Sequence, residues 1–537
     1  MKSTIRLVLA LAMALPFAAH ASNPLQIKTD KGKVRGALTP DGEVRAFKGI
    51  PYAAPPVGPL RWQPTQPAAK WKGVRDATQF GSRCMQAPIY EDMVFRDPGP
   101  SEDCLTLNVW TPAKVKKGSL PVMVWIFGGG YMAGGTSEPR QDGQFLAHRD
   151  VVVVSMNYRL GIFGFFVHPA LTAESPHHAS GNYGLMDQNA ALEWVQKNIA
   201  NFGGDPHNVT IFGESAGSMS VSLLMASPLS QNRFHKAIGE SGGPFFLGNF
   251  RFKSREVQEQ RDAEFAQSAF GASTLDALRK IPAAELLDAA TKLPRESSIH
   301  FGPDVDGWFL PQPASEIFTQ GKQAHVPLLA GWNADDLSAD VLLPNPASTA
   351  EGFKAQAEAK FGPDAQEFLT LYPAGTDADA VKSVRLLAGD DFLVFSTWKW
   401  LEEQVKTGDA PVYRYRFDLG GPGDKFHPAS IGAFHSDDIE YVFGTLDSRP
   451  DAHWRPEDRA LSHQMQQYWT NFARTGDPNG GALSSNQELP KWPTYNAADQ
   501  WQVMHLNATS ASQPDAERPR FLFLEKMWSR MPATNQR

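Results

Sequence analysis

The stretch Val209-Thr-Ile-Phe-Gly-Glu-Ser-Ala-Gly217 decides the fold of this chain. Its first four residues read as a strand, and the small and apolar residues that follow Ser215, up to Met225, favour a helix. Residues 213–217 match G-x-S-x-G between a strand and a helix, the context expected of a nucleophilic serine. The two glycines leave room for a sharp turn that lifts the Ser215 hydroxyl above the edge of a sheet.

Two apolar runs upstream, residues 120–127 and 151–157, have the length and composition of interior strands in a sheet covered on both faces. Residues 185–202 are rich in Ala, Leu, Glu and Gln and predict a helix. The order strand, helix, strand predicts a parallel pair of strands joined by a right-handed crossover. We expect further helices within residues 252–293 and 350–361 and a strand at residues 326–330.

The composition is that of a large globular protein. Hydrophobic residues make up 42% of the 537 residues, which is enough for a sizeable core. The formal net charge of -7 provides no basic field for a polyanion, so nucleic-acid binding is not expected. The chain shows no internal repeat and no composition shift that marks a domain boundary.

The N-terminus has the pattern of a secretory signal. Lys2 and Arg6 precede an apolar run at residues 7–19, and Ala19-His20-Ala21 fits a cleavage site. We therefore predict a signal peptide at residues 1–21 and a single exported domain at residues 22–537, periplasmic or secreted. An uncleaved anchor is the alternative, but the run is shorter than the roughly 20 apolar residues that a membrane span needs.

The chain has two cysteines, Cys84 and Cys104. Export to an oxidising compartment favours a disulfide between them, which would contribute about 3 kcal/mol by closing the loop of residues 85–103. The alternative is two buried thiols.

A glycine triplet, residues 128–130, directly follows the first of the two apolar runs. Glycines allow backbone N–H groups to approach a ligand closely. We predict that the N–H groups of Gly129 and Gly130, with that of Ala216, form an oxyanion hole. A purely structural turn is the alternative, but it does not explain why the triplet and the serine motif occur together in this order.

Several segments together resemble the type-B carboxylesterase/lipase family, which includes the cholinesterases and bacterial para-nitrobenzyl esterases. The segments are residues 47–52, 102–108, 157–161, 184–188 and 202–217. The resemblance covers nearly the whole mature chain. It implies an α/β-hydrolase fold, with a large, mostly parallel central sheet and helices on both faces. It also implies hydrolysis of a small-molecule carboxylic ester, with no metal or other cofactor.

The resemblance implies a catalytic triad in the chain order serine, acid, histidine, which is also the order usual after a G-x-S-x-G elbow. His435 lies in residues 432–444, which are similar to the histidine segment of the family. The acid falls on Asp336 in residues 331–336, where the family usually has Glu. Asp can take this role. The adjacent Asp335 is the alternative acid.

By the same resemblance, Arg45 should pair with Glu102 and Arg159 with Asp187. Glu214 and Ser241 should form a polar layer behind Ser215. The alternative is that these are ordinary surface charges and hydroxyls.

Two other functions compete with ester hydrolysis. Some members of the family lack the catalytic residues and act as adhesion modules, but this chain keeps Ser215, His435 and an acid. A serine peptidase is the second rival, and nothing in the sequence suggests a peptide groove. A choline ester is disfavoured because residues 85–103 contain Tyr90 and Phe95 but no Trp, the best partner for a quaternary ammonium.

Overall fold

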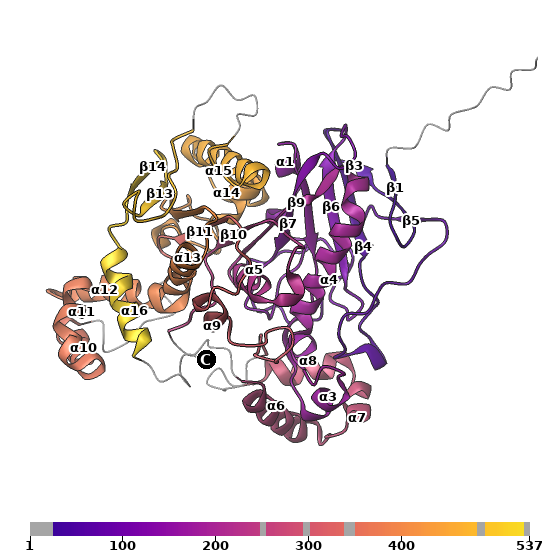
Figure 1. Ribbon diagram of the computed structural model, residues 1–537, viewed down its shortest axis with the longest axis horizontal. Helices are drawn as coiled ribbons and strands as arrows, with labels where there is room; N and C mark the ends of the chain where they lie inside the picture. Colours follow the sequence, from indigo (N-terminus) through magenta and orange to yellow (C-terminus); the bar gives the residue numbers. More distant parts are fainter. Residues whose placement is uncertain (1–24, 248–253, 294–300, 338–348, 481–488, 531–537) are drawn as a thin grey trace, which may run out of the picture.

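The computed structural model describes residues 25–247, 254–293, 301–337, 349–480 and 489–530 (Figure 1). Within these residues, eleven strands form one sheet in the order β14-β13-β12-β11-β10-β9-β7-β8-β6-β4-β3. Their bounds are β3 Ala37–Leu38, β4 Val44–Pro51, β6 Thr106–Pro112, β7 Leu120–Ile126, β8 Val152–Met156, β9 Gly204–Glu214, β10 Lys236–Glu240, β11 Leu328–Asn333, β12 Val412–Phe417, β13 Gln502–Leu506 and β14 Ala511–Pro514. A smaller sheet contains β1 Gln26–Lys28, β2 Lys33–Arg35 and β5 Val74–Asp76.

The central strands from β8 to β13 are all parallel, and the antiparallel pairs lie at the two edges of the large sheet. The predicted strands β8 and β9 run parallel, but β7 lies between them and pairs with both. The crossover that contains the predicted helix therefore passes over β7. The burial of β7 and β8 on both faces explains their nearly continuous apolar sequences.

Helices cover both faces of the sheet, as predicted (Figure 1). One face packs against α4 Tyr183–Asn198, α5 Ala216–Ala226 and α13 Phe395–Thr407, and α9 Ala314–Thr319 lies against α5 and α13. The other packs against α1 Gln144–Ala147 and α15 Pro456–Thr475, and α14 Ile439–Phe443 lies against α15. The remaining helices are α2 Gly161–Phe165, α3 Pro169–Glu174, α6 Arg255–Phe270, α7 Leu275–Lys280, α8 Ala283–Thr291, α10 Ala350–Phe361, α11 Ala365–Leu371, α12 Asp377–Gly389 and α16 Arg518–Ser529.

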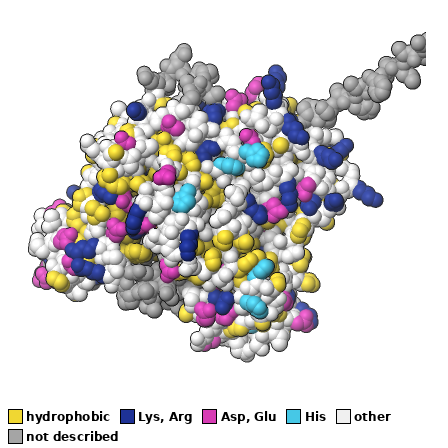
Figure 2. Space-filling model, viewed as in Figure 1, with side chains coloured by type: hydrophobic (Ala, Val, Ile, Leu, Met, Phe, Trp, Pro, Cys, Tyr) yellow, Lys and Arg dark blue, Asp and Glu magenta, His cyan; other side chains and the backbone are white. Residues whose placement is uncertain are grey.

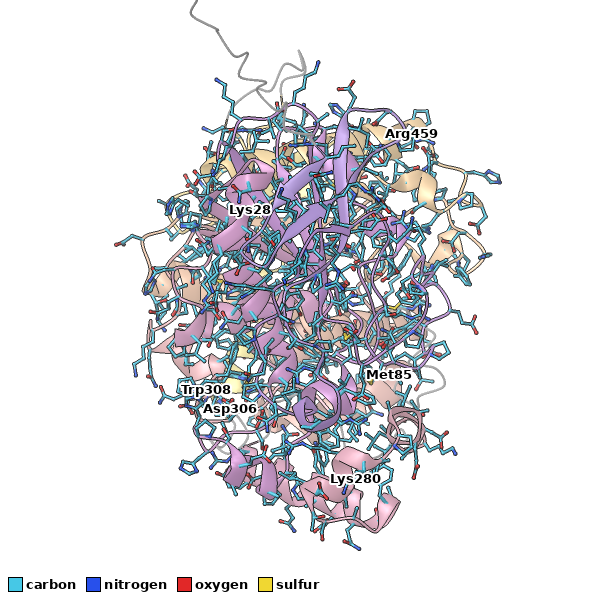
Figure 3. The ribbon with its side chains drawn as sticks, turned by 90° about the vertical axis from the view of Figure 1, so that its right-hand side faces the viewer. Lys28, Met85, Lys280, Asp306, Trp308 and Arg459 are labelled. Carbon is cyan, nitrogen blue, oxygen red and sulfur yellow. A yellow bond between two sulfur atoms is a disulfide. The ribbon has the colours of Figure 1, made fainter. Side chains whose placement is uncertain are left out.

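The outlying helices gather in two groups. In Figure 1, α10, α11, α12 and α16 lie together at one end of the molecule, and α3, α6, α7 and α8 lie together below the sheet. Figure 3 shows Lys280, the last residue of α7, at the lower end of the molecule and Arg459 of α15 near the top. The sequence predicted helices within residues 252–293, and the structure has α6, α7 and α8 there. The helix predicted at residues 350–361 corresponds to α10.

Cys84 and Cys104 form a disulfide, as predicted, with their Cα atoms 5.0 Å apart. The predicted signal peptide lies outside the described residues. Among the helices that the structure describes, none has the length and apolar character needed to cross a membrane. Acidic and basic side chains both occur across the face seen in Figure 2.

One predicted ion pair is present and the other is wrong. Arg159 and Asp187 form a buried, two-point pair, with Nε–Oδ2 and Nη2–Oδ1 distances of 2.7 and 2.8 Å. Glu102, however, pairs with Arg61 through two bonds of 2.7 Å. The reason lies in the register of β4 on β6. It places Arg45 opposite Thr111, towards the end of β6 that is far from Glu102.

Candidate active site

Ser215 stands at the turn between β9 and α5. Its backbone angles, φ 55° and ψ -123°, lie in a region that non-glycine residues rarely adopt, so the turn is strained. The Ser215 N–H donates to the Glu240 carbonyl at 2.8 Å, which fastens the turn to the end of β10. A Cβ on Gly217 would lie 2.0 Å from the Ile126 carbonyl oxygen, so only glycine fits beside β7.

His435 lies between two of the other predicted site residues. Its Nε2 is 2.9 Å from Ser215 Oγ, and its Nδ1 is 2.8 Å from Asp336 Oδ1. The three residues come from the carboxyl end of β9, the loop after β11 and the loop before α14. The structure therefore brings together three side chains that are 99 and 220 residues apart along the chain.

The two neighbouring aspartates point to different partners. Asp336 is buried and bonds to His435. The Asp335 carboxylate accepts the Ala433 N–H at 3.1 Å, and the Asp335 N–H donates to the Ala433 carbonyl at 2.9 Å. Asp335 thus holds the loop that carries His435 without touching the imidazole.

The glycine triplet lies beside Ser215 at the end of β7. Gly129 and Gly130 have φ angles of 99° and 63°, and a Cβ on Gly129 would lie 2.2 Å from the Ala133 carbonyl oxygen. Within the described chain, the N–H groups of Gly129, Gly130 and Ala216 have no protein acceptor. Ala216 is also the first residue of α5, where the helix dipole favours negative charge.

Buried carboxylates surround the imidazole. Glu214 Oε1 lies 3.2 Å from His435 Nε2, and burial raises the pKa of Glu214 to about 8. Asp438 accepts a hydrogen bond from the Tyr415 hydroxyl at 3.0 Å, and burial together with the charge of Asp336 raises its pKa to about 6.

Glu240 and Asp438 were not among the predicted site residues. Glu240 is fully buried, and its Oε1 accepts the Trp469 indole N–H at 2.7 Å. A sequence signal existed for each. Glu240 immediately precedes the predicted Ser241, and Asp438 lies three residues after His435 in the same segment. Neither position looks unusual until the fold buries it.

The charge around His435 controls its protonation. Burial alone would lower the pKa of His435, but the carboxylates of Glu214 and Asp336 outweigh it and raise the pKa to about 9. The neutral imidazole, which is the form that can accept a proton, therefore predominates only at pH values above this pKa.

Ser241 occupies a position like that of Ser215, at the end of the adjacent strand. It has a positive φ of 50°, and its N–H donates to the Gly331 carbonyl at 2.9 Å. Its buried hydroxyl has no hydrogen-bond partner among the described residues. Glu214 is thus buried at the carboxyl end of β9, directly before Ser215, and Ser241 is buried directly after the neighbouring strand β10.

Comparison with known proteins identifies the family of this chain. Residues 23–522 match the model of the carboxylesterase family. The fumonisin B1 esterase of Sphingopyxis macrogoltabida is 38% identical over 90% of this chain and 87% of its own length. The para-nitrobenzyl esterase of Bacillus subtilis is 36% identical over 93% of this chain and 99% of its own. A solved structure titled PNB esterase superposes with a TM-score of 0.76 at 34% identity, covering 93% of this chain and 100% of that one. With the mixed sheet and the serine turn described above, these similarities show that the chain belongs to the carboxylesterase family of α/β-hydrolase enzymes.

Proposed function

We propose that this enzyme cleaves carboxylic esters through an acyl-enzyme formed on Ser215. The observation that carries the proposal is the continuous chain of contacts from Ser215 Oγ through His435 to Asp336 Oδ1. Neutral His435 takes the proton of the Ser215 hydroxyl as the oxygen attacks the ester carbonyl. The C–O bond then breaks, and His435 gives that proton to the leaving alcohol.

Water completes the cycle. It attacks the acyl carbonyl while His435 accepts one proton from the water. The bond to Ser215 Oγ then breaks, His435 passes that proton to Ser215 Oγ, and the carboxylic acid leaves. Asp336 holds the imidazole in the tautomer with the proton on Nδ1 and stabilises the imidazolium as it forms.

The developing oxyanion is held by the N–H groups of Gly129, Gly130 and Ala216. Among the described residues none accepts from these three N–H groups, which supports this role because each is available to the substrate. Loss of one such donor costs about 2.7 to 4 kcal/mol of transition-state stabilisation.

The test is covalent trapping. We expect a para-nitrophenyl ester to be hydrolysed and an organophosphorus probe to add to Ser215, as read by mass spectrometry of the labelled peptide. Ser215→Ala should lose both while keeping its circular dichroism spectrum. Labelling of the alanine variant at the normal rate would contradict the assignment, and a protein that binds esters without turnover would favour the adhesion-module alternative. A matched ester and amide pair separates an esterase from a peptidase.

We also propose that the mature enzyme is one domain, residues 22–537, that acts outside the cytoplasm. The disulfide supports this, because such bonds persist in oxidising compartments. N-terminal sequencing of the exported protein should begin at Ser22. An intact Met1 in the exported protein would instead indicate an anchor.

A further inference from the structure

An exposed apolar cluster lies directly over the glycine triplet. A Cβ on Gly130 would lie 3.4 Å from the Tyr90 hydroxyl and 3.5 Å from Met132 Cε, and one on Gly129 would lie 3.1 Å from Met93 Cε. We call Tyr90, Met93 and Met132 the lip. Tyr90 and Met132 keep 39% and 40% of their surface exposed. All three lie next to the glycines of the proposed oxyanion hole, where they can contact an ester bound at Ser215.

The segment that carries Tyr90 is fixed in place. The side chain of Gln86 forms two hydrogen bonds with the backbone of Gly134, at 2.7 and 2.9 Å. Asp92 accepts a hydrogen bond from the half-buried Arg140 at 3.3 Å. The disulfide of Cys84 holds the start of the same segment (Figure 3, where the adjacent Met85 is labelled). Because its segment is held in this way, the Tyr90 side chain loses little conformational entropy when its hydroxyl donates to a ligand.

The Tyr90 hydroxyl is available to a ligand. It has no hydrogen-bond partner in the described part of the chain. Burial and the negative charges of Glu214 and Asp92 raise the pKa of Tyr90, so the phenol stays protonated and can donate. The same two carboxylates disfavour an anionic ligand group, and the charge of Arg140 is already paired with Glu138 and Asp92. The acceptor that fits is therefore a neutral oxygen.

The two methionines of the lip indicate which kind of ligand group carries that oxygen. Thioether side chains are flexible and polarisable, and they make favourable contacts with aromatic rings. The Tyr90 ring adds a further aromatic surface at the same place.

From this geometry we propose that the lip binds an aromatic group of the ester and that the Tyr90 hydroxyl donates a hydrogen bond to a neutral oxygen on that group. The proposal rests on ester hydrolysis at Ser215 and names the substrate class that the site selects. Tyr90 is in this account a specificity-determining residue, separate from the groups that stabilise the oxyanion.

The experiment compares isosteric esters. Benzyl acetates that carry a methoxy group at the ortho, meta or para position are each paired with the corresponding ethyl compound. Ethyl phenylacetates with the same substituents place the ring on the acyl side. Wild-type enzyme, Tyr90→Phe and the control Val94→Ala are assayed for kcat and KM on every pair. Val94 is exposed in the same segment.

We expect Tyr90→Phe to raise KM about fivefold for at least one methoxy ester, the size of one neutral hydrogen bond, with kcat unchanged. KM for its ethyl partner should not change, and Val94→Ala should preserve the preference for methoxy. An effect among the benzyl acetates would show that the lip binds the alcohol group of the ester. An effect among the ethyl phenylacetates would show that it binds the acyl group. An equal change for both members of every pair, or a uniform fall in kcat, would overturn the proposal. The latter would place the phenol on the oxyanion instead.

The proposed function is judged separately. Turnover of the ethyl-bearing esters reports on the esterase itself, because these compounds offer the phenol no oxygen on the ring. Met132→Ala provides a second measurement, since it should weaken binding of benzyl acetate more than of cyclohexylmethyl acetate. Equal weakening of both would contradict the aromatic part of the proposal.

Discussion

His435 Nδ1 lies 2.8 Å from Asp336 Oδ1, while the carboxylate of the preceding residue, Asp335, bonds to the backbone of Ala433. Adjacent carboxylates therefore have separate tasks. We expect Asp336→Asn to lower kcat by about 10⁴, because the amide stabilises the wrong imidazole tautomer. Steady-state kinetics with a para-nitrophenyl ester and the melting temperature are the measurements, and the melting temperature should change little.

The matched control is Asp335→Asn. This change keeps an acceptor oxygen for the Ala433 N–H and leaves Asp336 in place, so we expect a loss of less than about tenfold, within the range of one weakened neutral hydrogen bond. A crippled Asp335→Asn beside a nearly normal Asp336→Asn would mean that the acid is Asp335.

A second prediction concerns pH. The carboxylates of Glu214 and Asp336 raise the pKa of His435 to about 9 against the opposing effect of burial, and the base must be neutral to act. Activity should therefore rise with pH through an alkaline midpoint. Glu214→Gln removes one negative charge 3.2 Å from Nε2, which lowers the pKa of His435 and moves the acid limb of the kcat/KM profile to lower pH.

The control for the pH shift is Glu193→Gln, on the exposed side of α4. Its profile should match that of the wild type. An acid limb that stays in place, or moves to higher pH, in Glu214→Gln would show that this carboxylate does not set the protonation of the base.

The parts of the site that the sequence could predict are those encoded locally. The serine turn needs a strand, two glycines and a helix start within a few residues, so Gly213, Ser215 and Gly217 are recognisable together. The glycine triplet is similar, because its conformation depends on the lack of a side chain. Asp336 could be placed only by its similarity to the family segment, since nothing local separates it from Asp335.

The rest depends on contacts between distant segments. The position of β7 between β8 and β9 follows from sheet assembly and has no local signature. Glu102 pairs with Arg61, which follows η1, residues Gly58–Leu60, whereas the register of β4 on β6 places Arg45 far from Glu102. Glu240 and Asp438 look like surface acids until burial makes them part of the site.

A third prediction concerns the disulfide. Replacing Cys84 and Cys104 together by Ser should cost about 3 kcal/mol by the chain-entropy estimate, because the unfolded chain gains freedom. The melting temperature of the double variant should fall below that of the oxidised wild type. A reductant should lower the wild-type value and leave the variant unchanged. Equal melting temperatures for all the samples would show that the bond contributes nothing measurable.

The last prediction tests the corrected ion pair. Arg61 and Glu102 expose only 6% and 14% of their side chains, and Arg61 Nη1 also donates to the carbonyls of Arg279 and Ile281, at 3.2 and 2.6 Å. Removing one partner of a buried pair leaves the other charge uncompensated, which costs about 3 to 5 kcal/mol. We therefore expect Arg61→Met to lower the melting temperature strongly and the double change with Glu102→Gln to recover part of the loss. Arg45→Met, which leaves the Glu102 pair intact, should be milder. If Arg45→Met is the more damaging change and Glu102→Gln rescues it, then Arg45 is the partner of Glu102 in solution.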